Sequence, residues 1–224
     1  MDRLVLWNID LTLLDVGRVS RDSYADAFRR VTGRSLSALP QLSGRSDTEI
    51  FFESLFLNDV PTGLDETADA ELLEQGRLLP GAKAAVAATA DLPGVVQTVV
   101  TGTIKPNAAT KLRAFGLEDF FDLEIGGYGS DAYPRGSQLL MARSRAGEKY
   151  GTTIGEDSAV YLADTVRDMA AAEVGGARCI GVATGRSTMA ELREAGADLV
   201  LADLADTEHV ITAIDRLTRV PAGR

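Results

Sequence analysis

Short apolar runs recur along this chain, and helical patterns separate most of them. The runs lie at residues 3–9, 95–101, 122–126, 158–163, 177–182 and 198–201. Each has the length of a strand, and none approaches the ~20 residues that a membrane span needs. Strands that alternate with helices form a parallel sheet whose two faces are both covered by helices. The sequence therefore predicts the α/β class, with a doubly wound parallel sheet.

Residues 16–79 interrupt this alternation, because they contain no convincing strand. Apolar side chains recur at helical spacing in this stretch, at Tyr24, Phe28 and Val31. Further on, the segment SDTE (46–49) has the form of a capping box, which opens helices. We therefore expect two domains: a helical insert over 16–79, and a sheet domain formed by 1–15 together with 80–224.

The chain is acidic, with 33 aspartates and glutamates against 23 lysines and arginines and a formal net charge of −10. It has no basic cluster, which argues against nucleic acid as a partner. The first apolar run begins at residue 3 and leaves no room for a secretory signal, so we expect a cytoplasmic protein without a membrane anchor. An acidic chain that handles an anion has to concentrate a few cationic groups at one place.

Polar side chains follow several of the expected strands, at the edge where a doubly wound sheet places its site. In chain order they are Asn8, Asp10 and Thr12, then Thr101, Gly102 and Thr103, then Arg135, and finally Asp164 and Asp168. Acidic side chains gathered at one edge repel one another unless a divalent cation lies among them, and oxygen ligands of this kind suit Mg²⁺. Asp164 has a second interpretation, as the N-cap of a helix that begins near Val166.

The order of these elements resembles that of the haloacid dehalogenase-like hydrolases. The resemblance rests on four elements: a first motif of the form DxDxT at 8–12, a threonine that ends the next strand, a basic residue, and DxxxD at 164–168. It covers nearly the whole chain and implies a Rossmann-like core with a helical cap at 16–79. Within the family, the chain looks like the capped phosphatases, such as phosphoglycolate phosphatases and β-phosphoglucomutase-like proteins.

The resemblance implies phosphoryl transfer through an aspartyl-phosphate. In the family the first aspartate of the motif attacks phosphorus, and Asn8 occupies that position here. Asp10 is implied to protonate the leaving group and then to activate water, which is worth about 10²–10⁴ in rate. The implied cofactor is Mg²⁺, held by Asn8, the backbone carbonyl of Asp10 and Asp164, with Asp168 in support.

A second set of residues is implied to hold the phosphoryl oxygens of a small phosphorylated metabolite. The set comprises Thr12, Thr101, Gly102, Thr103 and a cation. Arg135 matches the family's basic residue by its place in the chain and suits a bidentate grip on phosphate, with Lys105 as the alternative. On the loop before the capping box, Arg45 is expected to reach a carboxylate or a second phosphate of the substrate.

Asn8 is the main departure from the family pattern. An amide has nearly the shape of a carboxylate but no charge, so no aspartyl-phosphate can form and Mg²⁺ should bind more weakly. Three origins remain open: an engineered substitution that traps a ligand, a natural inactive relative, or a divergent enzyme with another route. The presence of Asp10, Thr101 and Asp164 favours an engineered or recent change over long degeneration. A smaller departure is Leu11, which stands where the family usually has glycine.

We therefore predict a Mg²⁺-dependent phosphatase scaffold on which the chain as written is deficient in turnover. Two alternatives remain. The first is a non-catalytic protein that binds a phosphorylated ligand and regulates through it. The second is a hydrolase of the haloacid dehalogenase type, which uses the same nucleophile without a metal.

Overall fold

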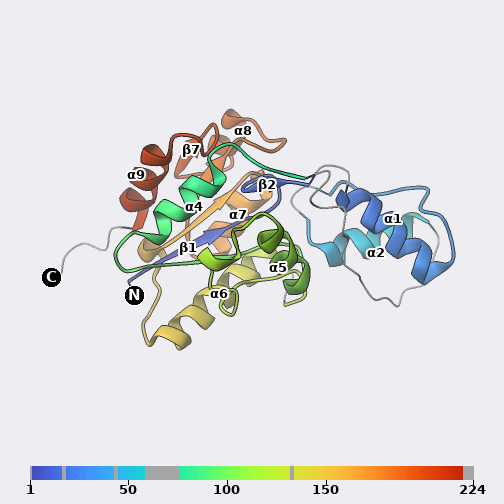
Figure 1. Cartoon of the computed structure of the whole chain (residues 1–224), viewed down its shortest axis with the longest axis horizontal. Coiled ribbons are helices and arrows are strands. Elements are labelled where there is room, and N and C mark those ends of the chain that lie inside the picture. The colour runs from blue at the N-terminus through green and yellow to red at the C-terminus, as the bar shows by residue number, and fades with distance from the viewer. Residues whose placement is uncertain (1, 17–18, 43–44, 59–75, 132–133, 219–224) are drawn as a thin grey trace.

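The centre of the protein is a parallel sheet (Figure 1). The structure, a computed structural model, describes residues 2–16, 19–42, 45–58, 76–131 and 134–218. Within these residues the sheet has five strands: β1 (Arg3–Trp7), β4 (Val95–Val99), β5 (Ala159–Ala163), β6 (Arg178–Val182) and β7 (Leu199–Leu201). Their order across the sheet is β4-β1-β5-β6-β7, so the chain starts in the middle and winds outward in both directions. The predicted α/β class and parallel sheet are confirmed.

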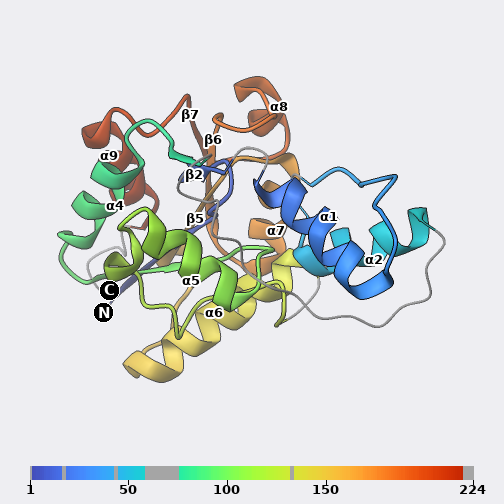
Figure 2. The ribbon, with the colours of Figure 1, turned by 45° about the vertical axis from the view of Figure 1, so that its right-hand side comes forward.

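Both faces of the sheet are apolar, as a central parallel sheet requires. In β1, Val5 and Trp7 join one buried cluster, whereas Leu4 and Leu6 join the other. The Val5 cluster includes side chains of α4 (Ala82–Ala90), α5 (Lys105–Ala114) and α9 (Thr207–Thr218). The Leu4 cluster includes side chains of α6 (Arg135–Tyr150), α7 (Val166–Gly175) and α8 (Met189–Glu194). Figure 2 shows these helices on the two sides of the sheet.

The helix ends follow signals in the sequence. Pro106 lies in the first turn of α5, and Gly116 follows the end of that helix with a left-handed φ of 64°. A proline at the start and a glycine after the end are the usual limits of a helix. Single 3₁₀ turns follow α5, at η1 (Glu118–Phe120), and precede β5, at η2 (Glu156–Ser158).

Two helices lie beside the sheet, at the right of Figure 1: α1 (Val19–Thr32) and α2 (Asp47–Leu57). They share a small core of their own, in which Phe28 of α1 packs with Phe51 and Leu55 of α2. The predicted capping box is confirmed. The backbone N–H of Ser46 donates to the Glu49 carboxylate over 2.8 Å, and the N–H of Glu49 donates to the Ser46 hydroxyl over 3.1 Å.

A short antiparallel ribbon joins the two ends of the helical insert. It pairs β2 (Leu14–Asp15) with β3 (Arg77–Leu78), so the insert leaves and re-enters the sheet domain at one place. The expectation that 16–79 contains no strand is wrong at β3, because two residues are too short a pattern to recognise. The boundaries of the insert stay a prediction, and residues 59–75 lie outside the described residues.

The strand predicted at 122–126 is wrong. Two backbone hydrogen bonds hold the ends of this stretch beside β4, from Asp122 N to Gln97 O (2.9 Å) and from Gly127 N to Val99 O (3.0 Å). Between them no ladder forms, and Gly127 makes an isolated bridge to Val100. Along the described residues, no helix combines the length and the apolar character that crossing a bilayer requires.

Candidate active site

A cleft of about 720 Å³ lies at the carboxyl ends of β1, β4 and β5, where parallel sheets of this kind place their sites. Its other wall comes from α1, α2 and the loop between these helices. Nine of the predicted site residues line this cleft: Asn8, Asp10, Arg45, Thr101, Gly102, Thr103, Arg135, Asp164 and Asp168. The structure therefore gathers at one place residues that are up to 160 positions apart in the sequence (from Asn8 to Asp168).

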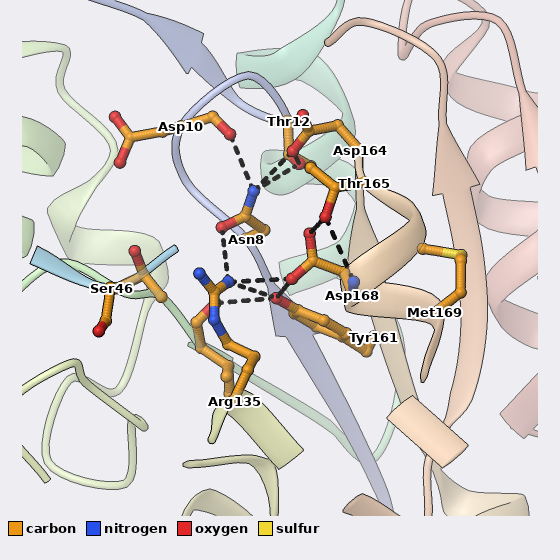
Figure 3. Close-up of polar contacts among 12 residues, drawn as sticks. Asn8, Asp10, Thr12, Ser46, Arg135, Tyr161, Asp164, Thr165, Asp168 and Met169 are labelled. Carbon is orange, nitrogen blue, oxygen red and sulfur yellow. Dashed lines mark hydrogen bonds and ion pairs between the residues drawn. The ribbon is translucent and has the colours of Figure 1, made fainter. Parts of the chain in front are cut away.

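The side-chain amide of Asn8 lies at the centre of the site (Figure 3). Its nitrogen donates to the backbone carbonyl of Asp10 over 2.8 Å, to Asp164 Oδ1 over 2.8 Å and to the Thr12 hydroxyl over 3.1 Å. Its oxygen accepts a longer hydrogen bond, of 3.4 Å, from the guanidinium of Arg135. Both ends of the amide are thus engaged, and the side chain is buried at the end of β1.

A buried ion pair stands beside Asn8. Arg135, the first residue of α6, places one guanidinium nitrogen 3.0 Å from Asp168 Oδ1 and 3.1 Å from the Tyr161 hydroxyl. The Tyr161 hydroxyl donates to the same oxygen of Asp168 over 3.0 Å. Burial lowers the pKa of Arg135, but Tyr161 and Asp168 outweigh that effect and raise it above its ordinary value. Arg135 therefore brings a fixed positive charge to the floor of the cleft.

The sequence allowed two roles for Asp164, as a metal ligand and as the N-cap of α7. The N-cap of α7 is Thr165, whose hydroxyl oxygen accepts the backbone N–H of Asp168, so the N-cap interpretation of Asp164 is wrong. The Thr165 hydroxyl also donates to Asp168 Oδ2 over 2.6 Å. Because Thr165 caps the helix, the carboxylate of Asp164 is left to face Asn8.

The carboxyl of Asp164 is nearly enclosed by protein. Burial, with repulsion from Asp168 as the second cause, raises the pKa of Asp164 to about 7. Its Oδ1 accepts hydrogen bonds from Asn8 and Thr12, whereas Oδ2 is buried without a hydrogen-bond partner among the described residues. A Cβ at Gly185 would lie 2.0 Å from Oδ2, so a side chain there would have to displace the Asp164 carboxylate.

The carboxylate of Asp10 points away from Asn8 (Figure 3). It pairs with Lys111, which the sequence did not indicate. Lys111 Nζ on α5 lies 2.8 and 2.9 Å from the two oxygens of Asp10. The Thr103 hydroxyl donates to Asp10 Oδ2 over 3.2 Å. Burial lowers the pKa of Lys111, but Asp10 and Asp47 together raise it above its ordinary value. No spacing in the sequence shows which face of α5 is turned to the cleft.

Asp47, the first residue of α2, connects the helical insert to the loop after β4. Its backbone N–H donates to Gly102 O over 2.9 Å, and its Oδ2 accepts the N–H of Ile104 over 3.2 Å. Its Oδ1 accepts a hydrogen bond from the Tyr24 hydroxyl of α1. Burial raises the pKa of Asp47, and Lys111 opposes the shift only in part. The insert is thus fastened to the sheet domain at the rim of the cleft.

Two of the predicted phosphate-binding threonines serve the protein's own structure. Thr12 is fully buried beneath Asn8 and does not line the cleft, so it supports Asn8 and Asp164 from below. Thr101 lines the cleft, and its hydroxyl oxygen accepts the backbone N–H of Thr103 over 3.1 Å. That hydroxyl keeps its own hydrogen to donate to a ligand.

The candidate cations differ in their position relative to the cleft. Arg135 reaches the floor of the cleft, whereas Lys105 is not among the residues that line it and lies with its Nζ 5.9 Å from the centre of the Tyr128 ring. Arg45 lines the cleft as expected, but its guanidinium forms an ion pair with Glu53 of α2. A substrate anion would have to compete with Glu53 for Arg45.

The fold and the site together define a Rossmann-like α/β protein with a cleft at the carboxyl edge of its sheet. A family model described as haloacid dehalogenase-like hydrolase matches residues 5–173. Since this match covers most of the chain, the protein belongs to the haloacid dehalogenase-like hydrolases. A comparison with curated proteins finds no match.

Solved structures share the fold at low sequence identity. A predicted phosphatase from Clostridium acetobutylicum superposes with a TM-score of 0.66 at 17% identity, covering 95% of this chain and 99% of that one. A hydrolase from Pseudomonas syringae gives 0.63 at 21% identity, covering 95% and 98%. CbbY from Rhodobacter sphaeroides, in complex with phosphate, gives 0.61 at 19% identity, covering 92% and 96%. At these identities the likeness establishes the fold.

Hydrolases of this family generally use a divalent metal. Here the Asn8 nitrogen, and not its oxygen, faces the Asp10 carbonyl and Asp164 Oδ1. Both carboxylate oxygens of Asp168 already accept hydrogen bonds from neighbouring side chains. Among the described residues, no group of three histidine, cysteine, aspartate or glutamate side chains lies close enough together to hold a metal ion. The arrangement does not fit a preformed Mg²⁺ site, and the metal-binding roles of these four residues stay predictions.

Proposed function

We propose that this chain binds the phosphate group of a small phosphorylated metabolite on a phosphomonoesterase scaffold and, as written, does not hydrolyse it. One observation carries the proposal. The Asn8 amide lies 2.8 Å from Asp164 Oδ1 and 3.4 Å from Arg135, at the position from which a carboxylate would attack phosphorus. An amide lacks the charge and the nucleophilicity that this step needs.

Arg135 supports the binding of a phosphate. Phosphoryl recognition depends on positioning and charge neutralisation more than on covalent chemistry. Asp168 and Tyr161 hold the guanidinium in place, and its planar fork matches the geometry of phosphate oxygens. Because Asn8 is neutral, an incoming phosphate dianion does not meet a carboxylate there. Binding without turnover is the outcome that this balance of charges favours.

Asp10 is the proposed acid and base of the scaffold. Its side chain is 37% exposed, lines the cleft and is held by Lys111. Acid–base assistance of this kind contributes about 10²–10⁴ in rate once a nucleophile is present. The scaffold therefore retains the auxiliary groups of the reaction and lacks the attacking one.

The size of the cleft supports a small ligand. Its volume of about 720 Å³ lies within the range of roughly 300–1,000 Å³ that is usual for small-molecule sites. The helical insert forms one wall, so specificity beyond the phosphate group is proposed to come from α1, α2 and the loop that joins them. A protein of the same fold, CbbY, is in complex with phosphate.

The variant Asn8→Asp tests this proposal. It is expected to hydrolyse p-nitrophenyl phosphate in MgCl₂ at least about a hundredfold faster than the unaltered chain, since loss of a nucleophile costs that much or more. The gain is expected to disappear in EDTA and in the double variant Asn8→Asp with Asp164→Ala. Asn107→Asp makes the same change of amide to carboxylate on α5, outside the cleft, and is expected to stay inactive.

Two results would contradict the proposal in different ways. If Asn8→Asp gains no Mg²⁺-dependent activity, the phosphatase scaffold is wrong. If the unaltered chain hydrolyses the ester as fast as the variant, the inactivity assigned to Asn8 is wrong. A panel of small phosphate esters then ranks substrates for the active variant.

A further inference from the structure

The side-chain nitrogen of Asn8 lies at a point where three oxygens converge. The Asp10 carbonyl and Asp164 Oδ1 are each 2.8 Å away, and the Thr12 hydroxyl is 3.1 Å away. Oxygens that converge in this way are the usual surroundings of a small hard cation. In this chain the three oxygens accept hydrogen bonds from the NH₂ group of Asn8. The partial positive charge of that group lies where the charge of a cation would lie.

Arg135 fixes the direction of this amide from the other side. It donates to Asn8 Oδ1, and it is itself held by Asp168 and Tyr161. If the amide turned by a half rotation, its NH₂ would face a guanidinium, which has donors only. Its oxygen would then face Asp164 Oδ1 and a carbonyl, which are both acceptors. The amide would lose its hydrogen bonds to the Asp10 carbonyl, to Asp164 Oδ1 and to Arg135. Only the Thr12 hydroxyl could still donate to the turned oxygen, so the orientation with nitrogen toward Asp164 is preferred.

We infer that the Asn8 amide takes the place of the divalent cation and that this chain binds a phosphate group without a metal. The inference rests on the proposed function and adds the ionic condition under which the ligand binds. An amide at position 8 leaves two carboxylates, Asp164 and Asp168, against the charge of Arg135. An aspartate at position 8 would make three carboxylates beside the same guanidinium, so the amide reduces the repulsion that a phosphate dianion meets there. No cation is then required to separate the phosphate from a carboxylate at position 8.

The free oxygen of Asp164 is where a metal would have to begin to bind. Asp164 Oδ2 is the atom of this carboxylate that has no partner among the described residues. The other oxygen, Oδ1, already accepts hydrogen bonds from Asn8 and Thr12. The inference therefore has to be tested by measuring metal binding directly as well as phosphate binding.

Calorimetric titration with inorganic phosphate tests the inference on the full chain. For the unaltered chain, Kd values in excess MgCl₂ and in EDTA are expected to agree within about twofold. For Asn8→Asp, binding is expected to be at least about tenfold weaker in EDTA, because the new carboxylate repels the phosphate when no cation separates them. Asn107→Asp is expected to behave as the unaltered chain does.

Electron paramagnetic resonance of Mn²⁺ gives the second readout. Asn8→Asp is expected to bind Mn²⁺ at least about tenfold more tightly than the unaltered chain, since it adds an anionic oxygen ligand. The inference is overturned by equal Mn²⁺ affinities, by tenfold weaker phosphate binding of the unaltered chain in EDTA, or by no phosphate binding in either solution. The phosphatase scaffold is judged separately, by the Mg²⁺-dependent activity of Asn8→Asp, so the two failures are distinguishable.

Discussion

Lys111 Nζ lies 2.8 and 2.9 Å from the two carboxylate oxygens of Asp10, in an ion pair that forms part of the cleft wall. The lysine side chain is 12% exposed and the aspartate 37% exposed, so water reaches one partner far more than the other. The pair holds the proposed acid–base group at a fixed position. Because the buried partner is the lysine, removing its charge leaves Asp10 without a counter-ion but still partly hydrated.

We expect Lys111→Met to lower the free energy of unfolding by about 0.5–1.5 kcal/mol, the usual net contribution of a hydrogen-bonded pair, because Asp10 stays partly hydrated without its partner. Urea unfolding followed by circular dichroism measures this loss. Lys149→Met is the matched control, because Lys149 pairs with Asp122 and Glu124 on the surface and should cost less. Equal losses in the two variants would mean that the Asp10 pair is no more protected from solvent than the surface pair.

A pH dependence is expected at Asp47, where burial raises the pKa. The folded chain keeps the proton of Asp47 to higher pH than the unfolded chain does, so ionisation of Asp47 opposes folding. The contribution of Asp47 to the free energy of unfolding is most favourable below its pKa of about 4 in the unfolded chain. It declines as the pH rises through the higher pKa of the folded chain. Asp47→Asn cannot ionise and retains an acceptor for the Ile104 N–H. The Tm of the variant minus that of the unaltered chain is therefore expected to increase as the pH rises above about 4.

Asp26→Asn provides a control of opposite sign. A hydrogen bond from Arg29 lowers the pKa of Asp26, so its ionised form favours folding. The corresponding Tm difference is expected to decrease as the pH rises through the acidic range. The prediction is contradicted if the Tm difference for Asp47→Asn does not change with pH, or if it decreases with pH as in the Asp26 control. Either result would show that ionisation of Asp47 does not weaken the contact between the insert and the sheet domain.

The fold could be predicted from the sequence because the strands of the sheet are short, mostly apolar runs. The stretch at 122–126 misled because Leu123 and Ile125 alternate with acidic residues, as in a strand, although only the ends of the stretch bond to β4. The turn after Asp10 shows a different limit. Leu11 adopts a left-handed φ of 60°, and the Thr184 hydroxyl donates to its carbonyl over 2.5 Å. That stabilising contact comes from a residue 173 positions away, which no local pattern reveals.

The site was predictable where backbone position alone decides what a side chain can reach. Strand ends bring Asn8, Thr101 and Asp164 to one edge whatever their rotamers. Long side chains on helices are different, because the rotation of the helix and several torsions decide their partners. The pairing of Lys111 with Asp10 depends on both, which is why the sequence did not indicate it.

Gly102 is expected to tolerate no side chain, because the insert approaches its backbone closely. A Cβ there would lie 2.5 Å from Arg45 O and 2.6 Å from Ser46 Cα, which are backbone atoms that cannot move aside by a rotamer change. We expect Gly102→Ala to lower the free energy of unfolding by about 1–3 kcal/mol and to weaken the binding of inorganic phosphate. Gly155→Ala is the control, since its Cβ would meet only Ser158 Oγ, at 3.7 Å. Indistinguishable unfolding curves for the two variants would contradict the close contact at Gly102.

Tyr161 is expected to act on phosphate binding through Arg135, which it contacts at 3.1 Å without lining the cleft itself. Tyr161→Phe removes one hydrogen bond of the guanidinium and leaves it with Asp168 and the longer bond to Asn8. A bond of this kind contributes about 0.5–1.5 kcal/mol, so the Kd of inorganic phosphate is expected to rise by a factor of about 2 to 13. Tyr128→Phe also removes one buried hydrogen bond, from the hydroxyl to Leu123 O, and should lower Tm similarly while leaving the Kd unchanged. The Tyr161 hydroxyl can affect phosphate binding only by orienting the guanidinium of Arg135. If both variants bind phosphate as the unaltered chain does, Tyr161 therefore supports only the fold.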